Sequence, residues 1–159
     1  MKTNDMFENW KLTGLKVNAL IDEMEWKPSD PDKAAAWDLY VELLTRIATQ
    51  PLPDEEGVEQ TALASIHDLF DITRQTLKTH GRDCIQFARI AIVVLNQIVR
   101  PFTAKWHRKS QQGAFALPEQ CRQFRRELQA LQAQLRNYTG LLAKLADVED
   151  LTGIEAEDL

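Results

Sequence analysis

An arginine and a histidine seven residues apart, Arg100 and His107, are the side chains of this sequence best suited to catalysis. On a continuous helix this spacing puts both on one face, two turns apart. They would suffice for RNA cleavage without a metal, because histidine can exchange protons with the reacting oxygens while arginine stabilises the developing charge. A structural role is the alternative, with Arg100 holding helix-end carbonyls or a carboxylate and His107 packed and hydrogen-bonded. We favour the structural role.

The segment from Arg100 to His107 resembles the loose R-x(4–6)-H motif of HEPN nucleases, small helical bundles that usually act as dimers with facing motifs. The resemblance implies a metal-independent endoribonuclease in which Arg100 and His107 are catalytic. It covers only this motif and the helical class. A polar residue commonly follows the arginine in that family, whereas Pro101 follows it here, and a proline kink would alter the geometry of the pair.

Cations and aromatic residues gather around the same histidine. From Arg100 to Arg126 the sequence has seven Lys or Arg residues and one acid, Glu119. We interpret this region as a docking surface with Trp106 as its apolar anchor and the cations as its rim. Its predicted partner-binding residues are Lys105, Trp106, Arg108, Lys109, Arg122, Arg125 and Arg126. A solvated helix face explains the last three arginines equally well, and RNA or a small phosphorylated signal are alternative ligands.

Composition argues against several function classes. The formal charge of -5 disfavours a duplex DNA binder. Phosphate-binding loops, nucleophile elbows and zinc-protease motifs are absent from the sequence, and the spacing of His67, His80, Cys84 and Cys121 suggests no metal site, so we expect no cofactor or metal. The densest apolar run, 85–99, is too short and too polar for a bilayer span, and we see no secretion signal at the N-terminus. These features predict a cytoplasmic protein without a membrane segment.

The elements that would position these residues are helices, because the six prolines cluster and leave long uninterrupted stretches. We predict an all-α four-helix bundle over 29–147, with a partly extended N-terminal arm (1–28) and an acidic C-terminal tail (148–159). The expected helices cover about 30–49 (with Asp30 and Pro31 as its start), 55–79 (terminated by Gly81), 82 onward, and 118–146. Pro101 is expected to kink or end the third, and 108–116 is expected to form a polar connection. In the first helix one apolar side is expected to carry Trp37, Tyr40, Val41, Leu44, Ile47 and Ala48.

The last helix has the clearest pattern. Apolar residues alternate at spacings of four and three to give a heptad seam of Leu117, Cys121, Phe124, Leu128, Leu131, Leu135, Tyr138, Leu142 and Leu145. Such a seam packs either within the bundle or against a second chain in a homodimer through helix 117–146. We favour packing within the bundle, because four-helix bundles use the same geometry.

Several stretches, among them 25–30, 37–46, 90–96 and 100–107, look like a family of small bacterial proteins without an established activity. The resemblance suggests a place among conflict or antiphage genes. Our leading hypothesis is a noncatalytic interaction or regulatory subunit of a bacterial defence or signalling assembly, docking another protein of the same system. The alternatives are the ribonuclease described above and a sensor of an anionic nucleotide.

Overall fold

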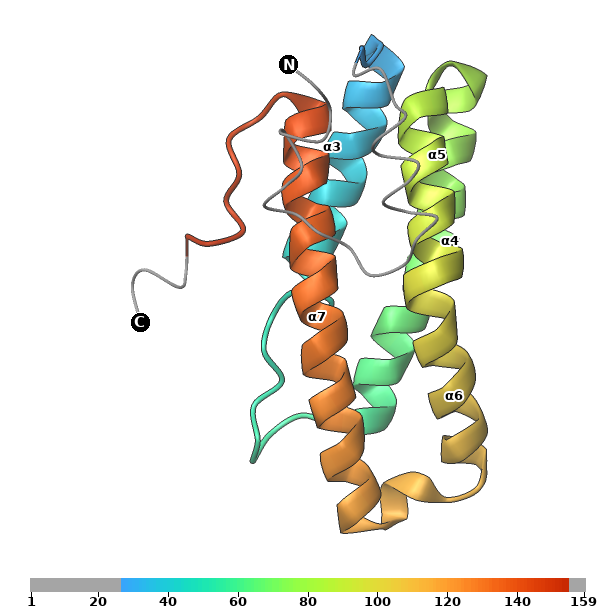
Figure 1. The fold of residues 1–159 in the computed structure, drawn as a ribbon, viewed down its shortest axis with the longest axis vertical. Coiled ribbons are helices and arrows are strands. Elements are labelled where there is room, and N and C mark those ends of the chain that lie inside the picture. Colours follow the sequence, from blue (N-terminus) through green and yellow to red (C-terminus); the bar gives the residue numbers. More distant parts are fainter. Residues whose placement is uncertain (1–26, 155–159) are drawn as a thin grey trace.

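Antiparallel helices form an elongated bundle in the computed structural model, which describes residues 27–154 (Figure 1). The helices are α3 (Asp30–Leu44), α4 (Glu59–His80), α5 (Ile85–Val94), α6 (Arg100–Gln111) and α7 (Pro118–Ala146). A π-helical segment, η3 (Leu95–Val99), joins α5 to α6, so these three make one rod. The predicted all-α four-helix bundle is therefore confirmed. Apart from Lys27 and Pro28, the predicted N-terminal arm lies outside the described residues.

Helix α3 begins at the predicted position, but Ser29 rather than Asp30 caps it. The Ser29 hydroxyl accepts a hydrogen bond from the Asp32 backbone N–H, and the Asp32 carboxylate accepts one from the Ser29 N–H. The other Asp32 oxygen accepts from the Phe87 N–H at 3.0 Å. This buried carboxylate thus joins the start of α3 to the start of α5, since it satisfies free amides at both helix ends.

The buried face of α3 differs from the predicted one. Trp37 and Val41 are exposed, and the residues that enter the core are Ala35, Ala36, Leu39, Tyr40 and Leu43. Helix α3 packs mainly on α7. Apolar residues lie on nearly all sides of α3, so its sequence pattern did not determine which side would be buried.

Pro101 does not break the rod. The Arg100 backbone N–H donates to the carbonyl of Leu95, five residues back, and the helix then continues to Gln111. A proline ring normally clashes with the carbonyl four residues before it, and the wider π turn accommodates the ring without a break. The predicted connection over 108–116 is accordingly helical at its start, and Gly113, at φ 83°, ends the turn that follows α6.

The rod from Ile85 to Gln111 is long and apolar enough to cross a membrane when judged by length and composition alone. Its apolar side chains, however, include Phe87, Ile90, Val94 and Val99, all packed inside the bundle. The rod is therefore the core element of a helical bundle. The cytoplasmic location stays a prediction.

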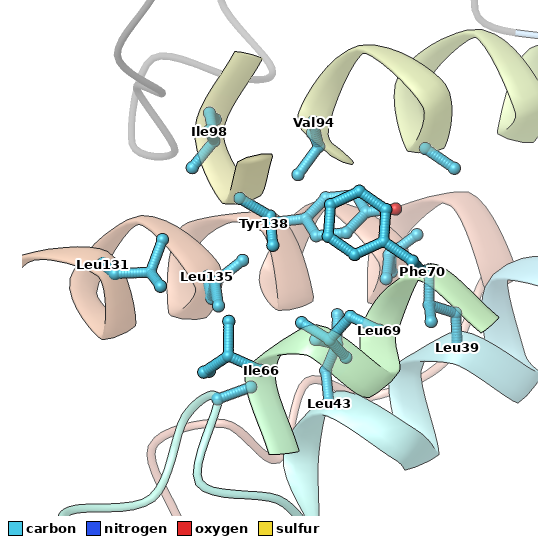
Figure 2. Packing of buried hydrophobic residues seen from close by; sticks show 14 of the residues in the cluster. Leu39, Leu43, Ile66, Leu69, Phe70, Val94, Ile98, Leu131, Leu135 and Tyr138 are labelled. Atoms are coloured by element: carbon cyan, nitrogen blue, oxygen red, sulfur yellow. The ribbon is translucent and has the colours of Figure 1, made fainter. Parts of the chain in front are cut away.

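Helix α7 has the predicted bounds, and its seam packs within the chain. Leu131, Leu135 and Tyr138 belong to one buried cluster with Ile66 and Phe70 of α4, which Figure 2 shows together with leucines of α3 and residues of the rod. Most seam positions are buried, whereas Cys121 is partly exposed and Leu117 is exposed. A homodimer through this face of helix 117–146 would therefore require the bundle to open.

The predicted second helix starts four residues later than expected, at Glu59, and ends as expected at Gly81, whose φ is 74°. After α7 the chain turns at Asp147, at φ 59°. The Leu151 backbone N–H then donates to the Tyr40 hydroxyl at 2.6 Å, so the start of the predicted acidic tail lies against α3. The end of that tail, 155–159, is outside the described residues.

Candidate functional site

Trp106 is a core residue, and the prediction that it anchors a partner is wrong. Its side chain is 0% exposed, stacked on Phe115 with the ring centroids 5.9 Å apart and edge-on to Phe124 at 5.2 Å. Helix α6 turns this position toward α7. The ammonium groups of Lys105 and Lys109 lie 5.4 and 5.2 Å from the indole centroid, so cations cover the ring in a cation–π arrangement.

Both of these lysines are also held by α7. Lys105 makes a salt bridge to Glu127 at 2.7 Å, and Lys109 donates to the side-chain carbonyl of Gln120 at 3.1 Å. Burial alone would raise the pKa of Glu127, but hydrogen bonds from Lys105 and Gln123 and the lysine charge bring that pKa below its usual value. These lysines therefore tie α6 to α7, and less of their charge is left for a partner.

Arg125 also has an internal role. Its guanidinium makes a salt bridge to Glu59 at 2.9 Å, with both side chains only 17% exposed, and donates to the backbone carbonyl of Pro53 at 2.7 Å. A further bond reaches the Gly57 carbonyl at 3.4 Å. Arg125 thus attaches the loop before α4 to α7, and its partly buried ion pair makes it a poor candidate for the rim of a docking surface.

The other predicted cations face outward. Arg108, Arg122 and Arg126 are exposed, and their side chains make no ion pair or hydrogen bond within residues 27–154. Arg122 and Arg126 are one turn apart on α7 and so share a face. Leu117, which precedes α7, is 56% exposed. We call these four residues, at the end of the bundle where α6 and α7 meet, the hairpin surface (Figure 1).

Sequence reasoning missed Leu117 as an exposed residue, because it stands in register with the heptad seam. The sequence does distinguish Leu117 from the other seam residues, because Pro118 follows it directly. Proline is favoured at the first helical position, so Leu117 is the residue before the helix, where the seam no longer applies.

Arg100 faces α4. Its guanidinium carbon lies 4.6 Å from the centroid of the Phe70 ring, and Nε and Nη2 donate to the Asn96 side chain at 3.2 and 3.1 Å. Because Asn96 is one turn before Arg100, the side chain is directed away from His107. Its observed contacts are those of a structural residue.

His107 also faces α4, where its ring meets His67 edge-on at 4.9 Å. Its Nε2 atom is buried and has no hydrogen-bond partner in the part of the chain that the structure describes. Burial lowers the pKa of His107, and the neighbouring His67 lowers it further. A buried ring nitrogen is poorly placed to exchange protons with RNA, and the structure does not bring Arg100 and His107 together on one substrate position.

Metal or thiol chemistry has no visible site between residues 27 and 154. No group of three or more His, Cys, Asp or Glu side chains there could hold a metal ion. The thiol of Cys84 is buried, and burial raises its pKa. Burial and the nearby Glu59 carboxylate raise the pKa of Cys121 as well. Both thiols are therefore protonated and weakly nucleophilic at neutral pH.

Comparison with known proteins gives no match: no family model, curated protein or solved structure shows significant similarity to this chain. The resemblances to HEPN nucleases and to a bacterial family stay predictions. The geometry of the described residues is what a functional proposal has to rest on.

Proposed function

We infer that the protein is a noncatalytic interaction subunit that docks an acidic partner protein through the hairpin surface. The observation that carries the inference is the unpaired state of Arg108, Arg122 and Arg126 within residues 27–154, next to three cations that are bound internally. A bacterial defence or signalling assembly is the proposed setting, on the strength of the sequence resemblance alone.

The chemistry of the hairpin surface suits a protein partner. Exposed arginines present planar forks of donors that match carboxylates, and charge complementarity raises the rate of association and selects the partner. The exposed Leu117 adds an apolar side chain to this set. Three arginines without partners among residues 27–154, on a chain of net charge -5, would release few counterions from a duplex, so an acidic protein is a better ligand than DNA.

The two alternatives have weaker support. Arg100 is directed toward Asn96, and the Nε2 atom of His107 is buried, which disfavours a ribonuclease that needs both side chains on one phosphodiester. A nucleotide sensor needs a concave cationic site, whereas the groove between α3 and α4 carries three carboxylates and no Lys or Arg.

Charge reversal tests the proposal. The triple variant Arg108→Glu, Arg122→Glu, Arg126→Glu is compared with the control triple Lys78→Glu, Arg82→Glu, Arg89→Glu. The control makes the same charge change at exposed cations of α4, of the short 3-10 helix η2 (Gly81–Asp83) and of α5. Tagged proteins are recovered from the native host after crosslinking, and bound proteins and nucleic acids are quantified. Circular dichroism checks that both variants fold.

We expect the wild-type protein and the control triple to recover an acidic protein in stoichiometric amount. The triple variant of the hairpin surface should not recover it. Retention of that protein by this triple variant contradicts the proposal. RNA as the main bound species, with cleavage that His107→Ala abolishes, would favour the ribonuclease instead.

A further inference from the structure

A groove of about 570 Å³ runs between α3 and α4 on the outside of the bundle. Its apolar residues are Trp37 and Val41 of α3 and Ile72 of α4, and Trp37 is 46% exposed. Figure 2 shows Leu39 and Leu43 of α3 and Leu69 of α4 pointing into the core, so both helices already bury a different face. The groove is therefore a second apolar surface, separate from the core.

The groove is held in shape before any ligand binds. The Trp37 ring is stacked on Tyr40 with the centroids 5.8 Å apart, and Tyr40 is a buried core residue. Trp37 and Val41 are one helical turn apart and lie on the same strip of α3. An exposed tryptophan fixed by a core residue loses little conformational freedom on binding, and tryptophans of this kind dominate interface energies.

Carboxylates form the rim of the groove. Asp38, Glu42 and Asp71 line it, and no Lys or Arg from the described part of the chain does. Among residues 27–154 each carboxylate has an ionic partner: Asp38 binds His80, Glu42 binds Arg46, and Asp71 binds Arg74. The acids are themselves well exposed, so these pairs contribute little stability, and a carboxylate has further acceptor sites for a second cationic donor. The rim thus attracts cations and repels phosphates.

The shape of the groove selects a helix. Its α4 side runs from Asp71 to Thr79, which at about 1.5 Å per residue is roughly 12 Å, or two helical turns. Addition of an extended peptide by strand pairing needs a sheet edge, and helices α3 and α4 have none. An amphipathic helix places side chains at i, i+3, i+4 and i+7 on one face, and that pattern spans this distance.

We propose that the α3–α4 groove binds a short amphipathic helix of a partner protein, with apolar side chains on Trp37, Val41 and Ile72 and flanking Lys or Arg side chains on Asp38, Glu42 and Asp71. This surface is distinct from the hairpin surface in both position and charge. The chain then has one surface for an acidic partner and another for a basic helix, so it can bridge two proteins.

Calorimetric titration with designed peptides tests the groove. The probe is a helical peptide with a leucine stripe at i, i+3, i+4 and i+7 and lysines on its flanks. The comparison peptide has the same stripe with glutamates in place of the lysines. The proposal expects saturable binding of the lysine peptide that weakens with salt, and no binding of the glutamate peptide.

Matched variants locate the binding. The apolar variant Trp37→Ser has Ile92→Ser as its control, because Ile92 on α5 is equally exposed (46%). The charge variant is the triple Asp38→Asn, Glu42→Gln, Asp71→Asn. Its control is the triple Asp54→Asn, Glu55→Gln, Glu56→Gln in the loop before α4. The groove variants should bind the lysine peptide with an affinity lower by about tenfold or more, as expected for an interface hot spot. The control variants should bind like wild type, and thermal melts confirm folding.

Three results would overturn the proposal: no saturable binding of the lysine peptide, equal binding of the glutamate peptide, or equal binding by Trp37→Ser. Self-association of the protein that depends on Trp37 would assign the groove to a second copy and overturn it too. None of these results bears on the hairpin surface, because the two sets of variants share no residue.

Discussion

Two tryptophans in this molecule have environments opposite to those their neighbours in sequence suggest. Trp106 stands among Lys105, His107 and Arg108, yet it is completely buried. Trp37 follows three alanines and belongs to the predicted apolar side of its helix, yet it is nearly half exposed. Adjacent residues on a helix point in different directions, so the chemistry of immediate neighbours says little about burial.

Residues four positions away are more informative. Phe102 precedes Trp106 at that spacing and is buried with it. The residues four positions on either side of Trp37 are Lys33 and Val41, and neither is buried. The same distinction between inward and outward positions separates Arg125 from Arg122, and a set of substitutions can test it.

The largest expected effect is at Trp106. Trp106→Ala should lower the free energy of unfolding by about 3–5 kcal/mol, because it leaves a large cavity beside Phe115 and Phe124. Trp37→Ala should stay within roughly 1 kcal/mol, as expected for an exposed side chain. Urea unfolding followed by circular dichroism measures both. Similar losses for the two variants would break the comparison.

The arginines of α7 should repeat this contrast on a smaller scale. Arg125→Ala leaves the Glu59 carboxylate and the Pro53 carbonyl without their donor, which should cost about 2–3 kcal/mol. Arg122→Ala removes an exposed, unpaired side chain and should change stability by less than about 0.5 kcal/mol. Denaturant midpoints of the two variants, measured side by side, decide whether Arg125 is structural. Equal midpoints would mean that Arg125 can belong to the docking surface after all.

The sequence carried enough information for some elements and too little for others. The bounds of α7 follow from Pro118 and an unbroken heptad pattern, so that helix was predicted closely. The roles of Arg125 and Gln132 depend on carbonyls of a loop far away in sequence, since Gln132 donates to the Ile47 carbonyl across 85 positions. A local pattern contains no signal for contacts of that range.

Pro101 and the candidate site were harder for a related reason. A proline inside a helical pattern normally predicts a break, and the π turn that accommodates it depends on backbone geometry that no residue type specifies. The spacing of Arg100 and His107 predicted that both lie on one face of the rod, and both contact α4. It gave no indication that Asn96 would direct Arg100 away from His107.

The smallest effect concerns His107. Its ring is partly exposed while its Nε2 atom is buried, so its burial is intermediate between that of the two tryptophans. Since its pKa is lowered in the folded protein, the unfolded chain takes up a proton first as the pH falls below about 6.5. The contribution of His107 to the free energy of unfolding is therefore fully present above that pH. It is lost as the pH falls toward the pKa of His107 in the folded protein. The melting temperature should therefore drop on acidification before the carboxylates begin to titrate.

His107→Phe should reduce this drop, because the ring is kept but cannot be protonated. His67→Gln should reduce it in part, since the like charge that helps to lower the pKa of His107 is removed. Melting temperatures of the three proteins between about pH 7 and pH 5.5 provide the measurement. A drop of the same size in His107→Phe would mean that the buried Nε2 is not what makes folding sensitive to pH. The contrast between inward and outward groups would then hold for the tryptophans and arginines but not for His107.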